Sequence, residues 1–301
     1  MTTVEEGEFA IVFGNAVSDK HGYVIKVLAY DAPNTMGALA KRSKMPQQCL
    51  IPIPKDSAYS LAEWGAFSGR YFTAWANWHV SLNCWRSQMP DIDPSEIYVW
   101  GWGGGVTLVE LSLAKQMGCQ TAMMASSDKR LQLIYELGIP PIDRRRFLNL
   151  NFDQRNYKSD AAYRASYLEA KQLFLGLVKE YTHGNGVSIF IDNIGQPVFR
   201  ATLKALARQG VITTCGWKHG MKLTLMRALE AINRHIHVQT HFARYSEGLE
   251  AVKAARFAET GWMAPIANDK IYKWDEIPQL AEAYMAGQID SYFPLFEVNA
   301  P

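Results

Sequence analysis

The chain has 301 residues, of which 48% are hydrophobic and 20% are charged, and this is enough to bury at least one large core. Its 31 basic and 29 acidic residues nearly cancel, to a formal net charge of +2. That balance argues against a nucleic acid or an anionic membrane as the main partner and favours small, locally recognised ligands.

Cysteine usage and the N-terminal sequence bear on the cellular compartment. The four cysteines are widely spaced and include no C-x-x-C pair, so neither a disulfide framework nor a structural zinc site is indicated. The N-terminus lacks the basic and then apolar order of a signal peptide, and no apolar run approaches the ~20 residues of a membrane span. We therefore expect a cytoplasmic protein with no membrane partner.

The first 85 residues are predicted to form a β-rich unit followed by a long helix. β-Branched and aromatic residues predict strands at 9–13 and 23–29. Prolines keep 51–54 extended, because each proline disfavours helix in the residue before it. A helical pattern then covers about 61–85.

From residue 97 onward the pattern alternates between strand and helix, which predicts a parallel sheet with crossover helices. The predicted strands are 98–100, 121–125, 187–192, 211–215 and 235–242. The predicted helices are 108–117, 129–137, 160–181 and 197–208. A smaller closing unit follows, with a helix at 246–257, an extended segment at 265–272, a helix that ends at 285 and a strand at 293–298.

The helix predicted at 160–181 carries an apolar and aromatic stripe on one face. We expect the stripe to pack on the sheet or on a neighbouring subunit. Ser159 is expected to cap the start of this helix, and Gly184 to end it. The stripe consists of Tyr163, Tyr167, Ala170, Phe174, Leu177 and Tyr181.

A glycine-rich turn, V-W-G-W-G-G-G-V-T at 99–107, lies between a predicted strand and a predicted helix. Glycine lets the backbone approach a pyrophosphate, and the N-terminal amides of the helix attract its negative charge. This context matches the dinucleotide-binding fingerprint of a Rossmann domain, except that Thr107 stands where the third glycine permits close packing of helix and strand. The alternative is a tight turn with no ligand. The expected cofactor contacts are Gly101, Gly103, Gly104, Gly105 and Val106.

The tip of the second strand indicates which dinucleotide is bound. An enzyme that uses NAD places a carboxylate there, on the ribose hydroxyls. Here Ala125 occupies the tip. The residues that follow offer hydroxyls and positive charge to the extra phosphate of NADPH. Asp128 is expected to face solvent. Ser127 can also act as the N-cap of the helix that follows, and this role does not exclude phosphate binding. The phosphate-binding candidates are Ser126, Ser127, Lys129 and Arg130.

Several motifs together resemble the medium-chain dehydrogenase/reductase superfamily, and within it the crotonyl-CoA carboxylase/reductases. They are G-W-G-G-G-V at 101–106, S-S-D-K-R at 126–130, I-D-R at 142–144, I-D-N-I-G at 191–195, G-V-I-T-T-C at 210–215 and T-H-F-A-R-Y at 240–245. The resemblance implies an α/β fold with a Rossmann doubly wound parallel sheet at 86–243. It further implies a GroES-like β-rich catalytic domain with a bridging helix at 1–85, and a return to that domain at 244–301. The N-terminal segment of the family is missing, so we expect a truncated catalytic domain.

The resemblance implies an enzyme in which hydride from NADPH adds to an α,β-unsaturated acyl thioester carried by coenzyme A or by an acyl carrier protein. It also implies a homo-oligomer that assembles through the edge of the Rossmann sheet. Further cofactor contacts implied by the family are Asn193, Cys215, Gly216 and Thr73. Packing alone is the alternative role of Thr73, because an amphipathic helix would bury it in any case.

Carboxylating members of the family hold carbon dioxide with an aromatic-acid pair, a histidine and an asparagine. Tyr30 and Asp31 correspond to the pair and His241 to the histidine, so these three are the candidate catalytic residues. Asp31 is shorter than the glutamate of the family, and the asparagine falls in the missing segment. A carbon dioxide molecule would be poorly oriented in such a site, which argues against carboxylation. The alternative function is a protein that has lost redox turnover and serves as a non-redox catalyst or a binding partner in a biosynthetic pathway.

His235, His237 and His241 form an H-x-H-x-x-x-H run whose spacing resembles that of metal ligands. No cysteine or carboxylate lies close enough in sequence to complete a ligand set, so no metal is predicted. Cys215 has no base beside it in sequence, and we expect it to line the site and not to act as a nucleophile.

Overall fold

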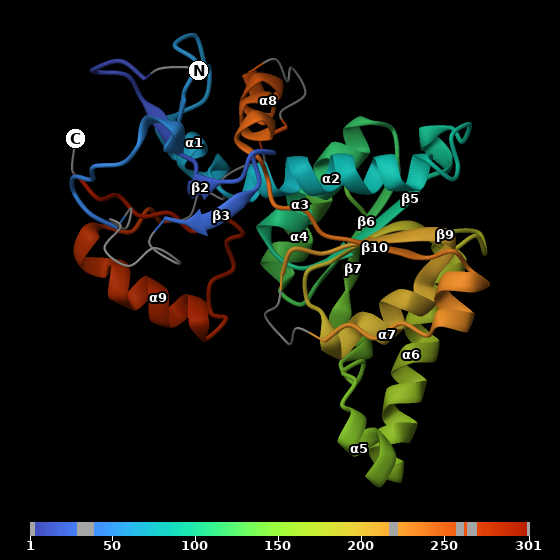
Figure 1. Cartoon of the computed structure of the whole chain (residues 1–301). Helices are drawn as coiled ribbons and strands as arrows, with labels where there is room; N and C mark the ends of the chain where they lie inside the picture. The colour runs from blue at the N-terminus through green and yellow to red at the C-terminus, as the bar shows by residue number, and fades with distance from the viewer. Residues whose placement is uncertain (1–3, 29–38, 217–221, 257–261, 264–269, 300–301) are drawn as a thin grey trace. The chain divides into compact units, whose positions relative to one another are not determined.

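The computed structural model describes residues 4–28, 39–216, 222–256, 262–263 and 270–299 (Figure 1). The chain divides into two compact units, one formed by Asn77–His241 and one by the two segments Met1–Ala76 and Phe242–Pro301. In the described part of the chain, no helix is both long enough and apolar enough to cross a bilayer.

The unit Asn77–His241 is built on a six-stranded sheet in which every strand runs parallel to its neighbours. The strand order is β10-β9-β8-β5-β6-β7, so the chain starts at the centre, moves outward on one side, and then returns to build the other side. This is the doubly wound Rossmann order, and it confirms the predicted α/β fold. The strands are β5 (Tyr98–Trp102), β6 (Gln120–Ala125), β7 (Pro141–Asp143), β8 (Val187–Asp192), β9 (Leu206–Thr213) and β10 (His237–Gln239).

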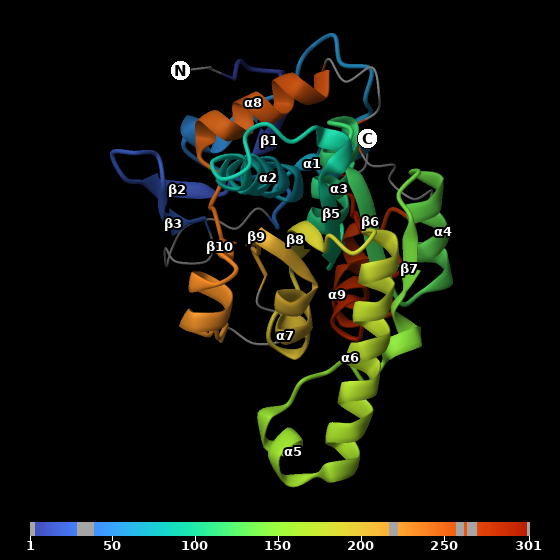
Figure 2. The ribbon, with the colours of Figure 1, turned by 90° about the vertical axis from the view of Figure 1, so that its right-hand side faces the viewer.

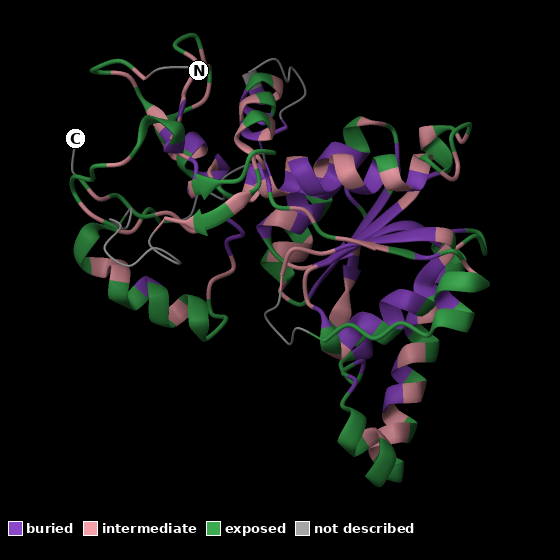
Figure 3. Ribbon diagram, viewed as in Figure 1, coloured by how far each residue is buried: buried purple, intermediate pink, exposed green. Residues whose placement is uncertain are grey.

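Helices cover both faces of this sheet (Figures 1 and 2). Crossovers between parallel strands are right-handed, so α3 (Gly105–Gln116) and α4 (Asp128–Glu136) cover one face while α6 (Ala161–Tyr181) and α7 (Gln196–Ala205) cover the other. All six residues of β8 are buried, as expected for a parallel strand that is covered on both faces (Figure 3).

The stripe on α6 packs on the sheet, as predicted. Tyr167, Phe174 and Leu177 are buried in the core cluster on this face, and the ring of Phe174 stacks on that of Trp102 at 5.0 Å between centroids. Tyr181, at the end of the stripe, stays 44% exposed.

The cap at the start of α6 differs from the prediction. The Asp160 carboxylate accepts hydrogen bonds from the backbone amides of Ala162 and Tyr163, so Asp160 and not Ser159 is the N-cap. Ser159 instead ends α5 (Gln154–Ser159), a short helix that the sequence pattern did not predict. α6 ends at Tyr181 with Thr182 as its C-cap, and the left-handed residue directly after the cap is His183, with a φ of +50°. Gly184, the predicted stop, lies one position further on with a φ of +86°.

Three other boundaries were predicted wrongly. The helix expected at 61–85 is broken at Gly69, where a φ of +68° separates α1 (Leu61–Phe67) from α2 (Arg70–Arg86). The helix expected to reach residue 208 ends at Ala205, because pairing with β8 draws the following residues into β9. Residues 293–298 form no strand, and only an isolated bridge joins Tyr272 to Phe296.

The other unit contains two small antiparallel pairs. β1 (Ala10–Val12) pairs with β4 (Leu50–Pro52), and β2 (Asn15–Ser18) pairs with β3 (Val24–Val27). An aromatic cluster that includes Phe67, Tyr71 and Trp262 forms much of its core. Its remaining helices are α8 (Tyr245–Arg256) and α9 (Ile277–Met285). The short 3-10 helices of the chain are η1 (Gln47–Cys49), η2 (Pro94–Glu96), η3 (Arg144–Phe147) and η5 (Trp274–Glu276), and η4 (Arg227–Ile232) is a π-helix.

Candidate functional site

The glycine-rich segment joins the centre of the sheet to α3. Gly101 is the fourth residue of β5, Gly103 has a φ of +155°, and α3 begins at Gly105, three residues before the predicted start. Gly104 has no side chain with which to cap the helix, so the first amides of α3 depend on other acceptors. A β-carbon at Gly104 would meet no heavy atom within 4 Å, and the surface over this residue is therefore open. An uncapped helix start beneath an open surface suits a bound anionic group.

Thr107 occupies the position of the third glycine in the fingerprint and is completely buried. A β-carbon at Gly101 would lie 2.5 Å from Thr107 Cγ2, and a β-carbon at Gly103 would overlap Thr107 Oγ1. Glycine is therefore required at both positions by packing within the turn itself. In the dinucleotide-binding fingerprint, the third glycine lies on the helix and lets the helix pack closely on the strand. Here Thr107 stands at that position, and the glycines on the strand and in the turn leave room for its side chain.

Asn193, directly after β8, ties three segments together. Its Nδ2 donates a hydrogen bond to Thr107 Oγ1 at 2.9 Å, and its Oδ1 accepts one from the Cys215 amide at 2.9 Å. The Cys215 thiol also donates to Oδ1, at 3.3 Å. A β-carbon at Gly216 would lie 2.8 Å from the Asn193 carbonyl oxygen, so glycine is required there too. The structure thus brings Asn193, Cys215 and Gly216 together beside the glycine-rich turn.

This constellation lies at the carboxyl edge of the sheet, between β5 and β8, where the strand order reverses direction. Ligands of open α/β sheets bind at such switch points. The turn after β8 is held by Asp192, whose buried carboxylate accepts hydrogen bonds from the amides of Ile194 and Gly195 and from the Thr202 hydroxyl. Burial raises the pKa of Asp192 from its usual value.

The tips of β6 and β7 adjoin one another and carry the predicted phosphate-binding residues. β6 ends at Ala125, which pairs with Asp143 at the end of β7. Ser126 and Ser127 follow β6, and Ser127 is the N-cap of α4 by backbone position, although its side chain makes no capping hydrogen bond. The cationic candidates Lys129 and Arg130 lie in the first turn of α4.

Sequence reasoning missed the role of Arg145 in this cluster. The Arg145 guanidinium contacts the Asp128 carboxylate at 2.5 Å and the Asp143 carboxylate at 2.8 Å. The hydrogen bond from Arg145 lowers the pKa of Asp143, and the two carboxylates raise the pKa of Arg145. Asp128 faces solvent as expected, with 83% of its side chain exposed, yet its charge is paired. The run R-R-R at 144–146 is the only sequence signal for this pairing.

Glu110, on the second turn of α3, is a buried acid. It is 1% exposed, and its Oε2 has no partner in the described part of the chain. Burial raises its pKa well above the usual range, which favours the neutral form of the side chain. Burial also raises the pKa of Cys215, which disfavours a thiolate nucleophile at that position.

The candidate catalytic residues are only partly described. Tyr30 and Asp31 lie outside the described residues. The backbone of His241 is held by Asn77, whose Oδ1 accepts from the His241 amide at 3.2 Å and whose Nδ2 donates to the His241 carbonyl at 3.1 Å. Thr73 lies on α2 and is half-buried. Among the residues with described coordinates, no cluster of histidine, cysteine and carboxylate side chains is arranged to hold a metal.

Comparisons with known proteins relate the chain to dehydrogenases and reductases. No protein-family model matches it. It is 25% identical over 250 residues to a crotonyl-CoA reductase from Streptomyces collinus, which covers 81% of this chain and 51% of the relative. A quinone oxidoreductase-like protein 2 homolog from Nematostella vectensis is 23% identical over 184 residues, 61% of this chain and 41% of the relative. The chain thus spans about half or less of the length of the curated relatives it matches.

Two solved structures illustrate the likeness in fold. Alcohol dehydrogenase TADH from Thermus sp. ATN1 matches with a TM-score of 0.73 and 16% identity, over 98% of this chain and 79% of that one. The crotonyl-CoA carboxylase/reductase AntE in complex with NADP matches with a TM-score of 0.63 and 19% identity, over 82% of this chain and 58% of that one.

Proposed function

We propose that this chain, which has the medium-chain dehydrogenase/reductase fold, is an NADPH-dependent reductase of an α,β-unsaturated acyl thioester carried by coenzyme A or an acyl carrier protein. The observation that carries the proposal is the carboxyl edge of the Rossmann sheet. There an uncapped start of α3, with open space above Gly104, lies on the same sheet edge as the cationic tips of β6 and β7. A dinucleotide with an additional phosphate matches both features.

The residues present fit this cofactor. The open amides at the start of α3 suit the pyrophosphate, and Ser126, Ser127, Lys129 and Arg130 suit the 2′-phosphate. Pairing of Asp128 with Arg145 removes the repulsion that a free carboxylate would exert on that phosphate. When bound, NADPH supplies the hydride for reduction of the substrate double bond.

The substrate class is proposed from the curated relatives named crotonyl-CoA reductase. Tyr30, Asp31 and His241 stay the candidate catalytic residues in this proposal. The network of Asn193 holds the backbone of Cys215 and Gly216 in a fixed position at the switch point, and we propose that this backbone orients the nicotinamide.

The proposal is tested by titrating the chain with NADPH and with NADH and following the fluorescence of the reduced nucleotide. We expect NADPH to bind at least about tenfold more tightly, because charge-assisted hydrogen bonds to a phosphate contribute roughly 1.5–3 kcal/mol. Lys129→Gln combined with Arg130→Gln is expected to remove this preference and to leave NADH binding unchanged. Lys179→Gln, an exposed position on α6, is the matched control.

Crotonyl-CoA is then added to the NADPH complex, and oxidation of the cofactor is followed by absorbance. Loss of absorbance with formation of the saturated thioester supports the reductase. Binding of NADPH without oxidation, on several enoyl thioesters, would support instead a protein that has kept the cofactor site and lost redox turnover. Failure to bind either nucleotide would refute the cofactor site altogether.

A further inference from the structure

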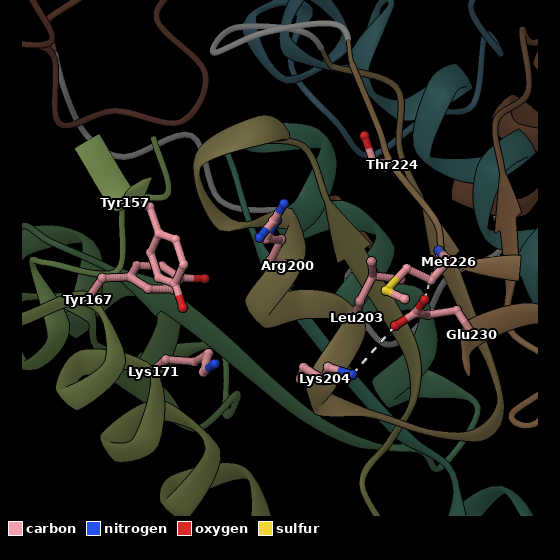
Figure 4. A pocket seen from close by; sticks show the side chains of 9 residues that line it. All are labelled: Tyr157, Tyr167, Lys171, Arg200, Leu203, Lys204, Thr224, Met226 and Glu230. Atoms are coloured by element: carbon pink, nitrogen blue, oxygen red, sulfur yellow. Dashed lines mark hydrogen bonds and ion pairs between the residues drawn. The ribbon is translucent and has the colours of Figure 1, made fainter. Parts of the chain in front are cut away.

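A separate pocket lies on the face of the sheet that α6 and α7 cover (Figure 4). Its volume is about 210 Å³. Most of the polar residues that line it come from four helices: Tyr157 of α5, Tyr167 and Lys171 of α6, Arg200 and Lys204 of α7, and Glu230 of η4, while Thr224 precedes η4. Its charged lining residues are three cations, Lys171, Arg200 and Lys204, and one carboxylate, Glu230.

This pocket is distinct from the glycine-rich turn. Helix α7 starts at the carboxyl edge of the sheet, after β8, and runs back to Ala205, directly before β9 begins. Lys204 therefore lies about 12 Å along the helix axis from the edge where the nucleotide is proposed to bind, at 1.5 Å per residue. None of the residues that line the pocket belongs to the turn or to the tips of β6 and β7.

The pocket contains more positive charge than its own carboxylate balances. Glu230 is buried, its Oε1 lies 3.5 Å from Lys204 Nζ, and its Oε2 accepts a hydrogen bond from the Met226 amide at 2.8 Å. In the part of the chain that the structure describes, no carboxylate pairs with Lys171 or Arg200. Two positive charges thus remain without an anionic partner.

The two unpaired cations contact aromatic rings. The Arg200 guanidinium lies 3.7 Å from the centroid of the Phe152 ring, and the Lys171 ammonium lies 5.8 Å from that of Tyr167. Burial, followed by repulsion from Lys204 and Arg200, lowers the pKa of Lys171. Such ring contacts orient a cation but do not neutralise it, so Lys171 and the exposed Arg200 both keep a positive charge that attracts an anion, reduced by solvent screening.

Hydroxyl donors complete the lining. Figure 4 shows the phenol oxygens of Tyr157 and Tyr167 and the ammonium of Lys171 turned toward the same side of the pocket. Burial raises the pKa of Tyr167 to about 12, so its hydroxyl keeps its proton and remains a donor near neutral pH. Phenol, guanidinium and ammonium donors together match an anion that accepts several hydrogen bonds.

We propose that this pocket binds the dianionic phosphoryl group of inorganic phosphate or of a small phosphomonoester. Two uncompensated cations match the charge of such a group, and the planar donor fork of Arg200 matches its oxygens. The volume is below the roughly 300–1,000 Å³ of pockets that enclose whole drug-sized ligands, which excludes an entire dinucleotide. The site is independent of the proposed reductase activity.

The test is isothermal titration of the full chain with inorganic phosphate and, separately, with glycerol 3-phosphate, in a chloride buffer that contains excess NADP. We expect one site for at least one of these probes. Lys171→Gln and Arg200→Gln should each raise its dissociation constant at least about tenfold, as loss of a charged hydrogen-bond donor does. Lys179→Gln, at an exposed position on α6, should bind as the unsubstituted chain does.

The two probes distinguish the two sources of the phosphoryl group. Preference for glycerol 3-phosphate identifies an organic phosphate, whereas equal or tighter binding of inorganic phosphate identifies the free anion. Thermal unfolding of each variant checks that it is folded. The absence of binding at millimolar concentration of both probes, or binding that survives both substitutions in the pocket, would overturn the proposal.

Discussion

Arg145 holds two carboxylates at the adjoining tips of β6 and β7. One of them, Asp128, follows directly on the two serines proposed to bind the 2′-phosphate of NADPH. An unpaired carboxylate at that place would repel the phosphate, so we propose that the preference for NADPH depends on Arg145 through Asp128.

We predict that Arg145→Gln weakens NADPH binding severalfold and leaves NADH binding nearly unchanged, because only NADPH carries the phosphate that an unpaired Asp128 would repel. Fluorescence titration with both nucleotides measures the effect. Adding Asp128→Asn should restore NADPH affinity to the single variant. If the double variant binds no better than Arg145→Gln alone, Arg145 acts by direct contact with the phosphate and not through Asp128.

Glu110 introduces a pH dependence into folding. Its pKa is raised in the folded state by burial, whereas in the unfolded chain it is about 4.3. Above that value the unfolded chain releases the proton and the folded chain retains it. The free energy of unfolding therefore falls as pH rises, by up to about 1.4 kcal/mol per pH unit, until the folded-state pKa is reached.

We predict that Glu110→Gln removes this dependence, because glutamine has the same shape and does not titrate. Urea unfolding of both proteins over a series of pH values measures the difference. The variant should gain stability relative to the original chain as pH rises above about 4.3. A constant difference across the series would show that Glu110 is ionised in the folded protein or reaches a partner.

At the scale of elements, the strand, turn and helix of the nucleotide site depend on one buried threonine. Sequence reasoning treated Thr107 as an imperfection of the fingerprint. In the folded chain it fills the space next to Gly101 and Gly103 and accepts a hydrogen bond from Asn193. β5 and α3 thus pack closely because glycines lie on the strand and in the turn, which leaves room for the threonine side chain on the helix.

We predict that Gly101→Ala destabilises the chain by about 1–3 kcal/mol, as overpacking of a filled site does. The new methyl would lie 2.5 Å from Thr107 Cγ2. Thr107→Ser deletes that methyl and keeps the hydroxyl, so the double variant should lose less stability than the two single variants summed. A double-mutant cycle by denaturant unfolding measures the coupling, and strictly additive losses would show that the two side chains do not compete for space.

At the scale of the whole molecule, both compact units protect their thiols. Cys49 lies in the unit that contains both termini, while Cys84, Cys119 and Cys215 lie in the Rossmann unit. Burial raises the pKa of each of the four, that of Cys119 to about 11. Thiolate is the reactive form, so the folded chain is expected to react slowly with thiol reagents.

We predict slow reaction of all four thiols with a disulfide reagent near pH 7, and rapid reaction of all four in denaturant. Mass spectrometry of partially labelled protein identifies which cysteine reacts first as denaturant is added. Labelling of Cys49 alone would report opening of its own unit, and labelling of the other three would report opening of the Rossmann unit. Rapid stoichiometric labelling of Cys215 in the folded chain would contradict the expected protection and revive the nucleophile hypothesis.

Much of the fold was readable from the sequence. Alternation of buried strands and amphipathic helices predicted the parallel sheet, because each element carries its own burial pattern along the chain. Segments whose state depends on distant pairing were predicted less well. Residues 206–208 continue a helical pattern and yet belong to β9, where Leu206 pairs with Val187 of β8. β7 has only three residues, too few for a periodic signal.

The sequence by itself determined the order of the elements, the glycine-rich turn at the end of β5 and the cationic residues after β6, because these are local properties of the chain. Only the tertiary structure decided how side-chain space is shared among Gly101, Thr107 and Asn193, which carboxylates Arg145 neutralises, and that cations from α6 and α7 converge on one pocket. Several of these features join residues from different elements of the fold, such as Thr107 with Asn193 and Lys171 with Arg200. Which of these residues meet is decided by the order of the strands and the packing of the helices, and no local sequence pattern indicates it.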